Sequence, residues 1–166
     1  SAPLLMQALE KYLFRKRIAD ADSTYQRILR LDPNNSMTLA EQAMRKMARF
    51  EENYTLDYAK AADYSKQMAE RFPNSPSVGG AVDGVFKTLL RAGRSREWSD
   101  WICLLLEKNP QAGSMHRAAA MTALHNGLRS PCFAQAARTA SRLNVGKPAF
   151  MDSIAVILEG DSPNKP

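Results

Sequence analysis

The chain has 166 residues, of which 45% are hydrophobic and 24% are charged, and its formal net charge is +6. These values are ordinary for a globular protein, so they exclude wholesale disorder. No apolar run approaches the roughly 18 to 20 residues that span a bilayer, so the sequence predicts no transmembrane segment. The moderate positive charge favours acidic partners but does not by itself indicate nucleic-acid binding.

Apolar residues that recur at spacings of three and four predict helices along most of the chain. The predicted helices pair into hairpins over about residues 4–31, 36–72, 77–108 and 114–143, and a last helix follows at 149–158. Ser36 is predicted to cap the helix that begins at Met37. The connection over residues 51–55 is longer than a tight turn between helices. Residues 160–166 include two prolines and no apolar residue, so we expect a disordered tail or linker there.

One short pattern closes three of these hairpins. It is clearest at residues 21–35, where Tyr25 and Ile28 lie on an apolar stripe and Pro33 stops the helix after Asp32. Phe72-Pro73-Asn74 and Asn109-Pro110 repeat this ending at offsets of 40 and 37 residues. The pattern resembles the second helix and exit turn of a tetratricopeptide repeat, whose period is about 34 residues. The resemblance implies a right-handed all-α solenoid of about four helical hairpins, capped by helix 149–158.

The resemblance also implies a non-catalytic scaffold or adaptor that holds a peptide or partner protein in a concave groove. The first helices of the hairpins would line this groove. Methionine suits such surfaces because it is flexible and polarizable, although a core position suits Met44 equally well. Lys87, Arg91 and Arg117 are expected to hold acidic groups of the ligand. The expected groove residues are Met6, Glu10, Phe14, Met37, Met44, Lys87, Arg91, Arg117, Met121 and His125.

A second set of basic residues falls at or near the turns inside the hairpins. In a solenoid these turns align, so the sequence predicts a basic edge. Its interpretations are a solvated surface without a partner, or attraction to an acidic protein, an anionic polymer or lipid headgroups. The basic edge consists of Arg15, Lys16, Arg17, Arg49, Arg94, Arg96 and Arg129.

The sequence contains no pattern for catalysis, metal binding or a cofactor. His116 and His125 are nine positions apart on one predicted helix, which places them on opposite faces, so we expect ordinary surface or groove histidines. No GxSxG, HExxH or phosphate-binding glycine pattern occurs. Gly79, Gly80 and Gly84 lie within a predicted helix, where they favour close packing of a neighbouring helix. A shallow floor in a ligand groove is the alternative.

The two cysteines, Cys103 and Cys132, have no CxxC pattern or neighbouring histidine, so they do not indicate a metal site. We expect both to be small buried residues with free thiols. A disulfide between them is the alternative. It would indicate an oxidising compartment such as a periplasm.

Two other functions remain open from the sequence. The chain could bind an anionic polymer, either RNA or an envelope polysaccharide. Nucleic acid is disfavoured because Trp98 and Trp101 lie on a second helix and are expected to be structural, whereas RNA readout adds exposed aromatic residues. The chain could also be an accessory domain of a larger bacterial membrane protein, or of a secretion or polysaccharide-assembly protein. We expect a soluble domain, either cytoplasmic or periplasmic. The sequence does not identify its partner or its oligomeric state.

Overall fold

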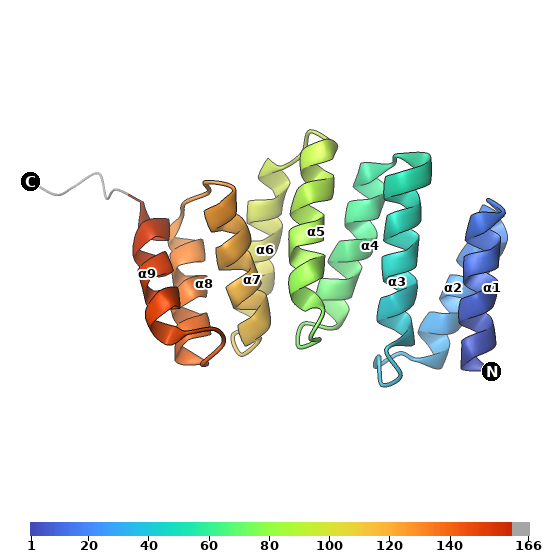
Figure 1. Ribbon diagram of the computed structural model, residues 1–166, viewed down its shortest axis with the longest axis horizontal. Coiled ribbons are helices and arrows are strands. Elements are labelled where there is room, and N and C mark those ends of the chain that lie inside the picture. The colour runs from blue at the N-terminus through green and yellow to red at the C-terminus, as the bar shows by residue number, and fades with distance from the viewer. Residues whose placement is uncertain (161–166) are drawn as a thin grey trace, which may run out of the picture. The chain divides into compact units, whose positions relative to one another are not determined.

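A computed structural model describes residues 1–160, which fold into helices joined by short turns (Figure 1). These residues form nine α-helices and one π-helical segment, and no strand. The prediction of an all-α fold with packed helix pairs is therefore confirmed. Within this range no helix combines the length and the apolar character needed to cross a membrane, as the sequence predicts. The predicted tail lies outside the described residues, except for Gly160 at the end of the last helix.

The chain divides into two compact units, and the second unit begins at Pro73. In each unit successive helices pack against one another as antiparallel neighbours. The first unit contains α1 (Ala2–Phe14), α2 (Ile18–Leu31), α3 (Leu39–Phe50), the π-helical segment η1 (Glu51–Thr55) and α4 (Tyr58–Arg71). The second unit contains α5 (Val78–Arg91), α6 (Arg96–Lys108), α7 (Gly113–His125), α8 (Pro131–Arg142) and α9 (Pro148–Glu159).

The core of the first unit forms where α2 and α4 pack behind α1 and α3. Ala21 and Ile28 are fully buried on α2, and Tyr25 beside them is buried too, as the apolar stripe predicts. The ring of Tyr25 meets that of Tyr64 edge to face, with 5.5 Å between their centroids. Such aromatic pairs contribute about 0.5–1.5 kcal/mol beyond the area they bury. The residues that resemble the repeat therefore hold α2 against α4.

The turn after α2 is organised by Asp32. Its side chain is only 1% exposed, and its carboxylate accepts hydrogen bonds from the N–H groups of Leu39 (2.9 Å) and Met37 (3.2 Å) and from the Ser36 hydroxyl (3.1 Å). Burial opposes ionisation of this carboxyl, but the hydrogen bonds outweigh it and lower its pKa. The prediction that Ser36 caps the next helix is wrong. Thr38 is the N-cap in a left-handed conformation, and Asp32 satisfies the free N–H groups.

The connection between α3 and α4 differs from the predicted loop. Residues Glu51–Thr55 continue α3 as a π-helical segment, and Leu56 then leaves it with a φ of 57°. Glu51 is buried and lies 3.0 Å from Lys60 Nζ, while the Thr55 hydroxyl donates a 2.5 Å hydrogen bond to its carboxylate. The polar residues that indicate a loop in the sequence are thus held by a partly buried ion pair and a hydrogen bond.

The core of the second unit is centred on Trp98, as expected for a structural tryptophan. Trp98 is fully buried, and its indole N–H donates a 3.0 Å hydrogen bond to the backbone carbonyl of Val82. Its ring meets Phe86 edge to face and stacks on Phe133, each with 5.4 Å between centroids. One side chain of α6 therefore joins α5 and α8.

Cys103 on α6 and Cys132 on α8 form a disulfide, with their Cα atoms 6.1 Å apart. The expectation of two free thiols is therefore wrong. Both helices are the second members of their hairpins, so they run in the same direction and bring residues 29 positions apart in sequence side by side. Sequence spacing alone does not reveal this neighbourhood, because it depends on how the two hairpins pack.

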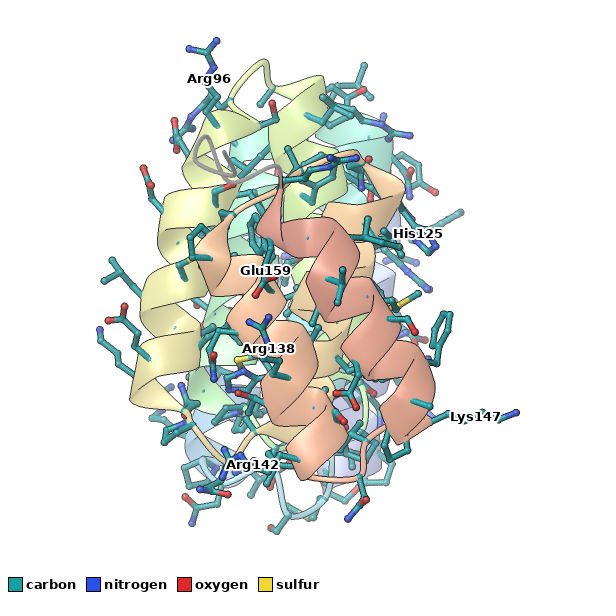
Figure 2. All side chains as sticks on the ribbon, turned by 90° about the vertical axis from the view of Figure 1, so that its left-hand side faces the viewer. Arg96, His125, Arg138, Arg142, Lys147 and Glu159 are labelled. Atoms are coloured by element: carbon teal, nitrogen blue, oxygen red, sulfur yellow. A yellow bond between two sulfur atoms is a disulfide. The ribbon has the colours of Figure 1, made fainter. Side chains whose placement is uncertain are left out.

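The last helix, α9, packs on α8 and α7 through Met151, Ile154 and Leu158, which are buried. Arg138 of α8 and Glu159 of α9 point toward one another and form an ion pair (Figure 2). The opposite side of α9 leaves Phe150 exposed. Helix α9 thus shields the final hairpin on one side while keeping apolar surface on the other.

Candidate partner-binding surface

The first helices of the two hairpins in the second unit, α5 and α7, pack side by side (Figure 1). A Cβ atom on Gly79 would lie 3.4 Å from the Cβ of Ala118, an ordinary van der Waals contact, so this part of α5 faces α7. A Cβ on Gly80 would meet nothing within 4 Å. The Thr122 hydroxyl on α7 donates a 3.3 Å hydrogen bond to Asp83 on α5. Gly79 therefore faces α7, whereas Gly80 lies at the open surface of the unit.

Each of these helices carries an exposed row of predicted groove residues. Lys87 and Arg91 are one turn apart on α5, and Arg117, Met121 and His125 follow at four-residue intervals on α7. Met121 is half-buried and the other four are exposed. Because α6 and α8 pack on the other side, the two rows share one surface. We call these five residues the α5/α7 row.

Lys87 of the α5/α7 row has a neighbouring counter-charge. Lys87 Nζ lies 2.6 Å from the carboxylate of Asp83, and the Lys87 side chain is 68% exposed. Such exposed pairs contribute roughly 0–1 kcal/mol, because water and salt screen them. A carboxylate from a partner can therefore replace Asp83 beside Lys87 at little cost.

The predicted groove residues of the first unit do not form one surface. Met6 and Met44 are buried in the core, so helix packing makes both unavailable to a partner, and the core alternative for Met44 is confirmed. Glu10 on α1 forms a 2.5 Å ion pair with Lys46 on α3. Phe14 is 86% exposed at the end of α1, and Met37 lies in the turn before α3 rather than on a helix.

The predicted basic edge is present only in part within the first unit. Arg15, Lys16 and Arg17 make the turn between α1 and α2, and Arg49 lies near the end of α3. Since α1 and α3 run in the same direction, these residues lie at the same end of the unit. Arg17, however, lies 2.7 Å from Asp20 and over the Tyr12 ring. Its charge is therefore balanced locally.

In the second unit Arg94 lies before α6, Arg96 begins α6, and Arg129 lies in the turn before α8. Arg94 makes two hydrogen bonds to Glu97, of 2.7 and 2.8 Å. Figure 2 shows Arg96 at the end of the unit opposite Arg142. Local carboxylates thus reduce the basic character that the sequence suggests.

A cavity of about 320 Å³, which the sequence does not predict, lies on the side of α6 and α8. The disulfide, Leu106, Glu107, His116, Ala136 and Arg142 contribute to its lining. His116 is only 6% exposed, so the expectation of a surface or groove histidine is wrong for this residue. Three helices assemble the cavity, and no local pattern in the sequence signals it.

Within residues 1–160 no group of three or more His, Cys, Asp or Glu side chains is placed to hold a metal ion. Comparison of the chain with protein-family models finds no matching family, and comparison with curated proteins finds no match.

Proposed function

We propose that this chain is a non-catalytic helical-repeat module of tetratricopeptide-like, right-handed form that binds a peptide or partner protein. The repeated helix endings at Pro33, Pro73 and Pro110 and the paired helices support this form. The α5/α7 row is the observation that carries the binding proposal, because it presents several cations and an adaptable methionine on one surface. The chain would act by holding its partner rather than by chemistry.

The partner segment is proposed to be acidic and extended. Arg91, Arg117 and Lys87 offer guanidinium and ammonium groups, and Arg in particular can bind a carboxylate through two parallel hydrogen bonds. Gly80 adds no side chain to the same surface of α5, so a peptide backbone can approach the helix there. Met121 supplies apolar contact area between the charged positions.

A selection from a random peptide library displayed on phage tests this proposal. We expect the immobilised protein to enrich acidic peptides, and the best of them, synthesised with a fluorescent label, to bind in a polarisation assay. Arg117→Glu and Arg91→Glu should each weaken this binding about tenfold or more, equivalent to roughly 1.4 kcal/mol. Helical circular dichroism should stay unchanged.

Lys108→Glu provides a matched control, because it makes the same change of charge on α6 of the same unit, away from the α5/α7 row. Its affinity for the selected peptide should equal that of the wild-type protein. Failure to enrich any peptide, or equal binding by both arginine variants and the wild type, would refute the proposed surface.

A second candidate function is binding of an anionic polysaccharide in a cell envelope. The disulfide favours it over RNA binding, since disulfides persist mainly in oxidising compartments outside the cytosol. A polymer held by its charge would lose affinity steeply as salt rises, because bound counterions are released. We expect only a shallow salt dependence for the selected peptide. A steep dependence with an acidic polysaccharide, and no peptide enrichment, would favour the polymer instead.

A further inference from the structure

The cavity beside α6 and α8 contains two opposite charges that do not pair. Glu107 of α6 and Arg142 of α8 both line the cavity. Figure 2 shows Arg142 at the lower end of α8. Neither side chain forms an ion pair within residues 1–160. Both charges therefore remain available to a molecule in the cavity.

His116 contributes its imidazole ring to the lining of the same cavity. Its Nε2 lies 3.0 Å from the backbone carbonyl oxygen of Asn109. A carbonyl only accepts hydrogen bonds, so Nε2 carries the proton and Nδ1 holds a lone pair. Nδ1 is buried and is the one buried side-chain nitrogen or oxygen within residues 1–160 that lacks a partner. Burial lowers the pKa of His116, so the ring is neutral at pH 7.

Nδ1 has almost no accessible surface, so a molecule in the cavity meets the neutral ring of His116 rather than this nitrogen. A ligand with only a carboxylate would be attracted by Arg142 and repelled by Glu107. A simple cation would be attracted by Glu107 and repelled by Arg142. The two charged side chains together match a molecule that carries both charges.

Much of the remaining lining is apolar and held in place, and Gln135 and Thr139 add two polar side chains. Leu106 and Ala136 are buried on α6 and α8, and the Cys103–Cys132 bond joins the two helices beside them. A covalent link between the walls lowers the ordering cost of binding, because the spacing of the helices is set before the ligand arrives. The volume of about 320 Å³ lies at the small end of ligand pockets.

We propose that this cavity binds a small zwitterion, namely a free amino acid with an apolar side chain. Its ammonium group would lie beside Glu107, and its carboxylate would lie beside Arg142. Its side chain would pack against Leu106, Ala136 and the disulfide. This site is on α6 and α8, so it does not depend on the peptide surface proposed for α5 and α7.

Titration of the ¹⁵N-labelled protein with each apolar amino acid, followed by ¹H–¹⁵N correlation spectra, tests the proposal. At millimolar concentration we expect at least one apolar amino acid to shift resonances of α6 and α8. L-leucine is the first probe. N-acetyl-leucine lacks the ammonium group and leucine amide lacks the carboxylate. Each should bind at least tenfold more weakly than leucine.

Glu107→Gln and Arg142→Gln should each weaken amino-acid binding about tenfold. Both residues are at the surface, so these variants should keep the wild-type spectrum. Lys108→Gln is the control, because it removes a charge next to Glu107 without touching the cavity, and its affinity should not change. No shift with any apolar amino acid would overturn the proposal. Equal binding of N-acetyl-leucine or leucine amide, or unchanged affinity in both glutamine variants, would also overturn it.

Discussion

Removing the disulfide should destabilise the second unit substantially. The bond closes a loop across 29 residues of sequence, which contains all of α7. The chain-entropy relation assigns about 3.6 kcal/mol at 25 °C to a loop of this length, because the cross-link restricts the unfolded chain. Since small domains have a net stability of roughly 5–15 kcal/mol, replacement of Cys103 and Cys132 by serine should remove a large share of it.

Urea denaturation followed by tryptophan fluorescence would measure this effect. Both tryptophans, Trp98 and Trp101, are on α6, so the signal reports on the second unit alone. With a urea dependence of about 1–3 kcal/mol per molar, a loss of this size lowers the midpoint by roughly 1–4 M. A reducing agent should move the wild-type midpoint to that of the serine variant, and it should leave the variant unchanged.

Two results would refute this reasoning. One is an equal urea midpoint for the wild-type protein and the serine variant, which would show that the loop closure contributes no stability. The other is a wild-type protein in which mass spectrometry after thiol alkylation finds both Cys103 and Cys132 free. The variant with alanine at Cys103 and Cys132 is the matched control. If its urea midpoint falls as far as that of the serine variant, the loss comes from the missing disulfide and not from the buried serine hydroxyls.

Two further predictions concern turns. Asp32→Asn should lower the free energy of unfolding by about 1–3 kcal/mol, because it removes the charge that the buried N–H donors of the turn stabilise. The pKa of Asp32 is lowered in the folded state, so its contribution is complete above pH 3.8 and is lost as the pH falls below that value. The difference between variant and wild type in urea midpoint should therefore narrow at low pH, and a constant difference would contradict this. Gly113→Ala should also destabilise the protein, since the added Cβ would lie 2.5 Å from Val145 Cγ2. Val145→Ala removes that contact, so the melting temperature of the double variant should fall by less than the sum of the falls in the two single variants. A fall equal to that sum would contradict the clash.

The sequence predicts the local elements well, because their signals lie within a few residues. Pro33 excludes a continuing helix whatever packs against it, and the spacing of Tyr25 and Ile28 sets the buried side of α2. The same local argument fails at Ser36, because α3 begins at Leu39 and the Asp32 carboxylate accepts the hydrogen bonds of the first N–H groups. The argument also fails at Glu51–Thr55. This polar stretch is π-helical, and Glu51 is buried in an ion pair with Lys60.

The candidate sites depend more strongly on the tertiary structure. The sequence places Lys87, Arg91 and Arg117 on first helices, and packing of α5 against α7 then brings them to one surface. Helical periodicity does not show which side of a helix a neighbour will cover, so it assigns Met6 to a groove when the residue is buried.

By itself the sequence determined the helices, their turns and the apolar stripes, since these follow from backbone geometry and from residues close along the chain. Only the tertiary structure decided that Cys103 meets Cys132 and that His116 is buried beside Glu107 and Arg142. These side chains come from helices that are separated in sequence. Their proximity depends on how whole hairpins stack, and no local interaction encodes that arrangement.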